Sequence, residues 1–329
     1  MRAELESLDK AEQVIAYIQE RAGLLQARDN RTYAFPHRTF QEYLAATHIL
    51  KQSEFDTMLR DRVRRDLTWW REVFLLAAGA SGSTPRIISD LVDCLVFKGP
   101  EQEMVSPNKA QQVQAIAQAL VETDFAEHVR KERINEPGRF STTYERIQKW
   151  LIAAVRSAHT LAARERAACG DTLARLGDPR FRPEAWYLPD EPLLGFVEIL
   201  DGPFLMGSNR KRDSEAYDNE LKQHKVTLLT YYIARYPVTV AQFQSFVSES
   251  RDTSRDPRSL QGLANHPVVY ATWHDALAYC EWLTEQLRNW QGTPEPLASL
   301  LNKQGWRVTL PSEAEWEKAA RGSDGRIYP

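Results

Sequence analysis

Apolar residues recur at helical spacing through much of the first 180 residues. Two stripes lie before residue 51, where such residues return every three or four positions, as on one face of an α-helix. Residues 32–35 between them predict a short strand, and a further helix is predicted from Leu67 to a stop near Gly79. The two stripes consist of Ala11, Val14, Ile15, Ile18, Ala22 and Leu25, and of Phe40, Tyr43, Leu44, Thr47 and Leu50.

Four more helices are predicted over 84–97, 107–131, 141–157 and 159–176. Short breaks that contain Gly and Pro join some of them, as at 98–100 and 136–138. Because short connections make successive helices antiparallel, this stretch is typical of a short α-solenoid. We therefore expect residues 81–178 to form a helical, HEAT-like region.

The pattern changes after residue 178. Prolines at positions 179, 183, 189 and 192 predict a proline-stiffened linker over 179–192. Beyond it, apolar runs at 196–200, 204–206 and 226–229 predict strands, and 239–249 and 272–288 predict helices. The fold class expected is multidomain, with an all-α N-terminal half and an α+β C-terminal domain over 193–329.

Composition excludes some classes of partner. The 329 residues suit about two domains, and 42 Lys and Arg against 45 Asp and Glu create no strong field toward nucleic acid or an anionic membrane. No apolar run reaches the roughly 20 residues of a membrane span, and the charged N-terminus is unlike a signal peptide. Cys94, Cys169 and Cys280 form no CxxC pair, which favours a reducing cytoplasm over a disulfide framework.

Three local patterns favour structural roles. Thr39 and Glu42 have the spacing of a capping box with Thr39 at the N-cap. The basic cluster at 60–66 (RDRVRRD) is interrupted by aspartates and indicates a solvated helix face. His37 and His48 lack the i, i+4 spacing of a helix-borne metal pair, so no metal site is expected there.

Residues 35–46 (FPHRTFQEYLAA) resemble the end of the winged-helix domain of STAND-class NTPases, the NACHT group in particular. The resemblance implies that residues 1–80 end such a region, and that His37 contacts a phosphate of ADP in the full-length protein. The alternative is that His37 only satisfies the strand–helix junction. No G-x-x-x-x-G-K-[ST] loop is present, so ADP or ATP would bind an upstream nucleotide-binding domain rather than this chain.

The second half resembles the formylglycine-generating-enzyme, or sulfatase-modifying-factor, family. Five ordered motifs carry the resemblance: 202–208 (GPFLMGS), 236–243 (YPVTVAQF), 266–273 (HPVVYATW), 275–283 (DALAYCEWL) and 310–322 (LPSEAEWEKAARG). It implies a C-type-lectin-like fold, here incomplete at its C-terminus. Family members that make formylglycine use two cysteines and copper in the C-terminal part of the domain, whereas Cys280 belongs to an apolar helix and is expected to be buried and inert.

Two functions follow as expectations. The first is a non-catalytic sensor region of a STAND-type signalling NTPase, in which residues 193–329 recognise an unknown protein or small ligand. The second is a copper-dependent formylglycine-generating oxidoreductase whose catalytic end lies outside this chain. We expect no catalytic residue and no cofactor or metal site within the chain itself, and no nucleic-acid or membrane partner.

Overall fold

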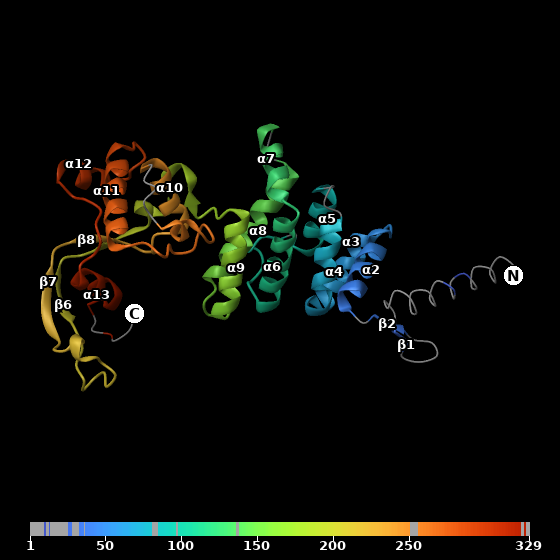
Figure 1. The fold of residues 1–329 in the computed structure, drawn as a ribbon, viewed down its shortest axis with the longest axis horizontal. Coiled ribbons are helices and arrows are strands. Elements are labelled where there is room, and N and C mark those ends of the chain that lie inside the picture. The colour runs from blue at the N-terminus through green and yellow to red at the C-terminus, as the bar shows by residue number, and fades with distance from the viewer. Residues whose placement is uncertain are drawn as a thin grey trace. The chain divides into compact units, whose positions relative to one another are not determined.

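The computed structural model describes residues 10, 13, 26–27, 33–35, 37–80, 85–96, 98–135, 138–250, 256–323 and 326 (Figure 1). The chain divides into two compact units, Met1–Gly177 and Asp178–Pro329. In its described part the first unit is helical apart from one short hairpin, and the second mixes short strands with helices. The predicted fold class, an all-α half followed by an α+β domain, is confirmed.

The first unit begins with an antiparallel pair of two-residue strands, β1 (Gln26–Ala27) and β2 (Tyr33–Ala34), so the strand predicted over 32–35 is confirmed. The helical stripe predicted over 11–25 lies almost entirely outside the described residues. The helices that follow are α2 (Arg38–Leu50), α3 (Phe55–Arg65), α4 (Leu67–Ala80), α5 (Pro85–Leu95), α6 (Pro107–Glu122), α7 (Phe125–Asn135), α8 (Arg139–Arg156) and α9 (Ala163–Leu176).

One hydrophobic core extends through this unit, from Ala46 in α2 to Leu176 in α9. Helix α2 packs against α4, α4 against α6, and α6 and α8 against α9 (Figure 1). The boundary drawn at residue 80 from the sequence does not separate two cores, because α4 and α6 lie in the same cluster. The largest fully buried side chains of this core include Leu59, Phe74, Ile116, Phe125, Ile147, Trp150 and Leu173.

The single helix predicted over 107–131 is two helices. Helix α6 starts at Pro107 after the Ser106 N-cap and ends at Glu122. Asp124 then adopts a left-handed backbone with φ +48°, which few residues other than Gly, Asn and Asp accept readily. Phe125, fully buried, opens α7, and its ring meets Phe140 edge to face at 5.6 Å. Burial of the Phe125 side chain stabilises the chain in this turn. This is a tertiary effect, which the helical periodicity of the sequence does not reveal.

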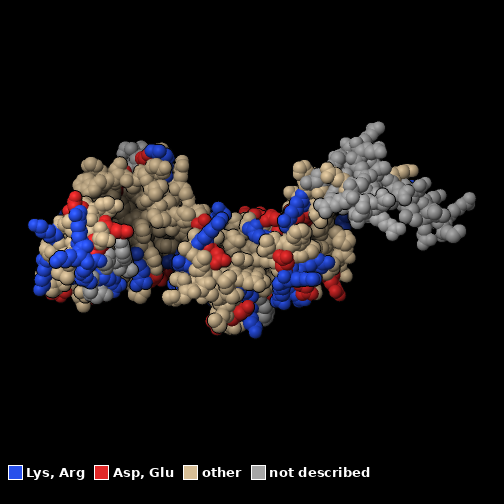
Figure 2. Space-filling view, turned by 90° about the horizontal axis from the view of Figure 1, so that it is seen from below, with Lys and Arg blue, Asp and Glu red and all other residues tan. Residues whose placement is uncertain are grey.

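The basic cluster of α3 makes contacts within the helical unit. The Arg62 guanidinium lies 5.2 Å from the centroid of the Trp70 ring, and Arg64 donates to the Cys94 carbonyl at 3.1 Å. Basic and acidic side chains are interspersed on the visible face of this unit (Figure 2). Asp61, Arg64, Arg65 and Asp66 are exposed, as predicted for a solvated helix face. Among the helices of the described residues, none combines the length and apolarity needed to cross a bilayer.

The second unit is built from short antiparallel strand pairs and helices. Strand β3 (Phe181–Arg182) pairs with β4 (Leu188–Pro189), β5 (Phe196–Ile199) with β8 (Tyr231–Ala234), and β6 (Gly202–Met206) with β7 (His224–Leu228). The three predicted strands are confirmed as β5, β6 and β7. The helices are α10 (Val240–Ser250), α11 (Trp273–Asn289), α12 (Leu297–Lys303) and α13 (Glu313–Arg321), with 3₁₀ turns η1 (Pro183–Ala185), η2 (Pro192–Gly195), η3 (Asp218–Glu220) and η4 (Pro257–Leu260).

Residues 179–192, predicted to be a linker, are folded onto the second unit. The Trp186 ring meets Trp282 at 5.9 Å and Trp290 at 5.7 Å, both edge to face, and its Nε1 donates to Glu249 at 2.9 Å. Leu188 is buried in the core of this unit. Pro183 and Pro192 begin 3₁₀ turns here, and Pro189 ends β4. The aromatic contacts of Trp186 hold the segment against α10 and α11.

The core of the second unit joins this segment to α10 and α11. Phe243 and Phe246 of α10 pack edge to face at 5.5 Å, and Phe246 also contacts Tyr279 of α11 at 5.7 Å. Helix α11 begins at a capping box in which Asp275 N donates to Thr272 Oγ1 at 3.2 Å and Thr272 N donates to Asp275 Oδ2 at 2.8 Å. This core positions α11 opposite β5 and β8, with a cavity bordered by all three.

Candidate functional site

His37 lies at the N-cap of α2, with an extended backbone of φ −116° and ψ 123° and no capping hydrogen bond from its side chain. The imidazole is exposed, and its centroid is 6.3 Å from that of the Phe40 ring. At a helix N-terminus, backbone N–H groups without intrahelical partners create a positive potential that favours anions. The position of His37 is compatible with the phosphate contact predicted for it.

The capping box predicted at Thr39 and Glu42 is wrong. The helix begins one residue earlier, at Arg38, whose Nε donates to the Glu42 carboxylate at 2.7 Å. The Arg38 guanidinium also lies 4.6 Å from the centroid of the Trp69 ring in α4. Opposite charges four residues apart attract on a helix, and a cation over an indole adds about 0.5–1 kcal/mol at an exposed site. These contacts fasten the start of α2, and with it His37, to α4.

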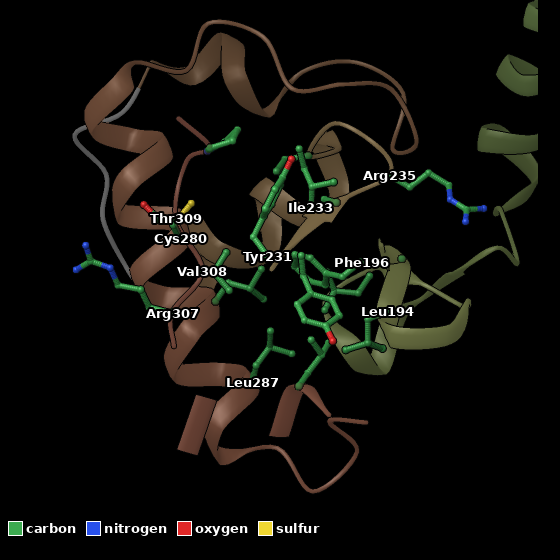
Figure 3. Close-up of a pocket in the computed structure, with 18 of the residues that line it drawn as sticks. Leu194, Phe196, Tyr231, Ile233, Arg235, Cys280, Leu287, Arg307, Val308 and Thr309 are labelled. Atoms are coloured by element: carbon green, nitrogen blue, oxygen red, sulfur yellow. The ribbon is translucent and has the colours of Figure 1, made fainter. Parts of the chain in front are cut away.

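The second unit contains a cavity of about 700 Å³ between β5, β8, α11 and the segment 306–311 (Figure 3). Strand β8 supplies Tyr231 and Ile233, α11 supplies Cys280 and Leu287, and Val308 closes the third side. A volume of this size is in the range of small-molecule sites, and it also accommodates several protein side chains. Other lining residues are Leu188, Leu194, Phe196, Tyr279, Leu283, Leu297, Leu301, Trp306, Leu310 and Trp316.

The polar groups around the cavity are engaged elsewhere or directed outward. Tyr231 donates its hydroxyl to the Glu315 carbonyl at 2.5 Å, and burial raises the pKa of Tyr231 to about 12, so the phenol is neutral at physiological pH. Arg235 pairs with Glu191 at 3.4 Å. The side chains of Arg235 and Arg307 extend away from the cavity centre (Figure 3). The cavity therefore offers apolar contact rather than converging acid–base groups.

Burial suppresses the reactivity of the cysteines. It raises the pKa of Cys280, which lines the cavity, to about 11, and it raises the pKa of Cys169 to the same level. The pKa of Cys94 is raised chiefly by burial and also by Asp56, toward which its Sγ donates at 3.6 Å. A thiolate is the reactive form, so at neutral pH all three side chains are weak nucleophiles. The predicted burial of Cys280 is confirmed.

The motif at 310–322 fastens α13 to the β6 region. Ser312 and Glu315 form a capping box: Ser312 Oγ accepts from Glu315 N at 3.3 Å, and the Glu315 carboxylate accepts from Ser312 N at 2.7 Å. Lys318, only 6% exposed, donates to the carbonyls of Leu200 at 2.6 Å and Gly202 at 3.1 Å. Glu315 and Lys318 of this motif thus have structural partners.

Position 207, near the end of the motif at 202–208, accepts only glycine. Its φ is +81°, and an added Cβ would lie 2.7 Å from the Glu220 carbonyl oxygen, so both conformation and space require glycine. Glu317 accepts from Gly207 N at 2.8 Å, and Arg321 donates to Gly207 O at 2.6 Å. Two of the predicted motifs therefore meet at one point, which sequence order alone did not reveal.

His37 belongs to the first unit and the cavity to the second. Across the ranges that the structure describes, no group of three or more His, Cys, Asp or Glu side chains could hold a metal ion. The site residues that sequence reasoning missed are those of β8 and the 306–308 segment, because single apolar residues in irregular backbone carry no periodic signal.

Comparison with known proteins connects both halves to families. Residues 187–329 match the sulfatase-modifying factor enzyme 1-like domain, and residues 2–49 match the winged helix-turn-helix domain C-terminal to NACHT.

Among similar proteins, the formylglycine-generating enzyme of Streptomyces coelicolor is 37% identical over 179 residues, covering 41% of this chain and 49% of that protein. The corresponding enzyme of Thermomonospora curvata is 27% identical over 188 residues, covering 43% of this chain and 54% of its own length. Serine/threonine-protein kinase pkn1 of Chlamydia pneumoniae is 28% identical over 159 residues, which cover 42% of this chain and 21% of that protein.

The chain thus spans about half the length of these two formylglycine-generating enzymes and about a fifth of the kinase. Its second half carries a sulfatase-modifying factor enzyme 1-like domain, and its N-terminus carries the winged helix-turn-helix segment that follows NACHT.

Proposed function

We propose that this chain is the sensor region of a STAND-type signalling NTPase, in which residues 193–329 recognise a ligand or protein partner without catalysis. The observation that carries the proposal is the presence in one chain of a NACHT-associated winged-helix segment and a sulfatase-modifying-factor-like domain. A switch NTPase needs a domain that detects a signal, and the domain after the helical region is placed to do so. Three unpaired thiols fit a cytoplasmic setting.

The relatives support an accessory role for this kind of domain. The similar region occupies only 21% of a protein named as a serine/threonine-protein kinase, so the domain also occurs as a minor part of a protein named for another activity. Cys280 is buried with a pKa near 11, and the charged residues Lys318 and Arg321 are bonded to backbone carbonyls. These features favour recognition by a rigid scaffold over chemistry at these residues.

The proposal also includes a role for ADP. In the full-length protein, His37 would donate to a phosphate of ADP held by an upstream nucleotide-binding domain and so stabilise a resting state. Its exposure ahead of the first turn of α2 supports this.

Comparing ADP release from the full-length protein with release from a form lacking residues 178–329 tests the sensor role. A sensor domain that restrains the switch should change the release rate at least about tenfold, which is about 1.4 kcal/mol in the activation free energy of release. Equal release rates, in a shortened protein that retains the circular dichroism spectrum of a folded helical unit, would contradict the proposal.

A second candidate is a copper-dependent formylglycine-generating oxidoreductase. The 37% identity to the Streptomyces coelicolor enzyme favours it. Its test is direct: the full-length protein is incubated with copper(I), dioxygen and a cysteine peptide of the sulfatase type, and the peptide is analysed by mass spectrometry. Conversion of the cysteine to an aldehyde would establish the enzyme and displace the sensor proposal.

A further inference from the structure

The two units are connected through residues 176–180 (LGDPR), since the first unit ends at Gly177 and the second begins at Asp178. Domains are commonly joined by exposed, flexible segments that make few contacts with either domain. In this chain the residues on both sides of the boundary are hydrogen-bonded instead, each within its own unit. These bonds decide what kind of connection the segment makes.

The last residues of the first unit are held by α8. Leu176 is buried, and its carbonyl accepts a hydrogen bond from the Tyr144 hydroxyl. The Gly177 carbonyl accepts from Gln148 Nε2 at 2.6 Å, and Gly177 N donates to the Ala174 carbonyl at 3.3 Å. The peptide group that follows Gly177 is thus fixed to α8, although Gly177 lies one residue beyond the end of α9.

The first residues of the second unit are held by partners of their own. The Asp178 side chain is 5% exposed, and its carboxylate accepts from Arg180 Nε at 2.9 Å and from Arg180 Nη2 at 2.6 Å. Asn265 Nδ2 donates to the same carboxylate at 2.9 Å. The segment of Asn265 is bonded in turn to the start of α10, where Val240 N donates to His266 O at 2.9 Å. Because a two-point contact between arginine and carboxylate also fixes orientation, Asp178 is held firmly in the second unit.

Little rotational freedom remains between these two sets of bonds. The Gly177 carbonyl, which is bonded to α8, and the nitrogen of Asp178 belong to one planar peptide group. Pro179 restricts the residue before it to extended conformations, so rotation about the N–Cα bond of Asp178 is limited as well. We propose that residues 176–180 form a rigid joint, through which a structural change in the second unit reaches α8 and α9. The transmission rests on the proposed sensor function, whereas the rigidity does not.

The width of a distance distribution between the units tests the rigidity. Spin labels are introduced as non-natural amino acids at two exposed positions of the 329-residue chain, Ala167 of α9 and Glu285 of α11, and pulsed electron paramagnetic resonance measures the distances between them. In a reference variant, the sequence Gly-Gly-Ser-Gly-Gly-Ser is inserted between Gly177 and Asp178. Because such a segment behaves as a flexible coil, the parent distribution should be at least about twofold narrower than that of the insertion variant. Equal widths would overturn the proposal.

Two substitutions test whether the hydrogen bonds are the source of this rigidity. Asp178→Ala removes the carboxylate that is bonded within the second unit, and Gln148→Ala removes the donor to Gly177 in the first. Each should broaden the distribution toward that of the insertion variant. Asp201→Ala makes the same chemical change as Asp178→Ala at an exposed turn between β5 and β6, and should leave the width unchanged. Thermal melting followed by circular dichroism identifies variants in which both units stay folded. The parent width in both folded variants would contradict the proposal.

ADP release from the full-length protein tests the transmission. If the joint carries the signal, the insertion after Gly177 should change the release rate by at least about tenfold, as expected for the form lacking residues 178–329. The same insertion after Ser214, in the exposed loop between β6 and β7, should keep the parent rate. A changed rate for the shortened form with the parent rate for the joint insertion would overturn the transmission and leave the sensor role standing. The parent rate in the shortened form would contradict the proposed function itself, and the distance distributions would still decide whether the joint is rigid.

Discussion

At the scale of single residues, burial and backbone partners decide what each motif residue does. Lys318 and Cys280 are chemically capable side chains, yet the first is bonded to carbonyls and the second is held as a thiol by burial. His37 differs from them, because its imidazole is exposed beside a helix N-terminus and makes no capping bond. The role proposed for it is a contact with a group outside this chain.

His37→Ala should weaken ADP binding by the full-length protein about ten- to a hundredfold. One charge-assisted hydrogen bond to phosphate contributes about 1.5–3 kcal/mol, which gives this ratio. Calorimetric titration of ADP measures it, with His48→Ala as the control, since His48 is exposed on the same helix and contacts Gln52. Equal affinities for His37→Ala and the parent protein would assign His37 to the junction alone, and tight ADP binding by the 329-residue chain would contradict the expected upstream site.

Cys280 should resist thiol reagents until the pH approaches 11. At pH 8 a group of pKa about 11 is about 0.1% thiolate, and reactivity should rise about tenfold per pH unit. The folded pKa lies above the ordinary value of 9.0, so the neutral thiol is favoured in the fold. Its contribution to stability is therefore present below pH 9 and is lost as the pH rises toward 11. Timed labelling followed by peptide mapping checks this, and rapid modification of Cys280 at pH 8 would show it to be accessible.

At the scale of elements, contacts between segments far apart in sequence hold the second unit together. Glu249 of α10 accepts from Trp186 at 2.9 Å and from Trp282 at 3.2 Å, which joins the first segment of the unit to α11. Lys318, Glu317 and Arg321 of α13 form hydrogen bonds with the backbone in and beside β6. Each of these bonds joins residues more than a hundred positions apart in sequence. Both sets of hydrogen bonds hold in place segments of the second unit whose own strands are short.

Lys318→Met should destabilise the second unit by about 1–3 kcal/mol. The substitution keeps most of the side-chain volume but removes the buried ammonium that donates to Leu200 O and Gly202 O. Urea unfolding of the second unit measures the change. Lys303→Met, at an exposed position in the last turn of α12, should alter stability by less than about 0.5 kcal/mol. Equal effects of the two substitutions would show that the hydrogen bonds of Lys318 contribute little to the stability of the second unit.

At the scale of the whole molecule, the chain consists of two units with separate hydrophobic cores. Each core is continuous within its unit: one lies among α2 to α9, and the other joins residues 188–194 to α10, α11 and α12. Because each unit has a hydrophobic core of its own, we expect each to unfold in its own transition.

Core substitutions should therefore affect one unfolding transition each. Leu173→Ala in α9 and Phe243→Ala in α10 each remove a fully buried side chain, at a cost of about 2–5 kcal/mol. Leu173→Ala should lower the transition of the helical unit alone, and Phe243→Ala that of the second unit alone. Differential scanning calorimetry resolves the two. A single transition shifted equally by both substitutions would show that the units unfold cooperatively.

The sequence by itself determined the periodic and local features. Repeated apolar faces at 3.6-residue spacing predicted most of the helices, and apolar runs predicted β5, β6 and β7. The ordered motifs were sufficient to relate the two ends of the chain to their families, as the comparisons confirm. These features depend on neighbours within a few positions, so the sequence carries them directly.

Only the tertiary structure decided features that depend on distant partners. The prolines of 179–192 suggested a linker, but Trp186 finds Trp282 and Trp290 about a hundred residues later and folds the segment onto the second unit. At the start of α2, Arg38 lies over Trp69 of α4, and Glu42 pairs with Arg38 instead of forming a capping box. The break at Asp124 depends on burial of Phe125. In each case the contact joins residues that are not neighbours in sequence, so no pattern of neighbouring residues contains it.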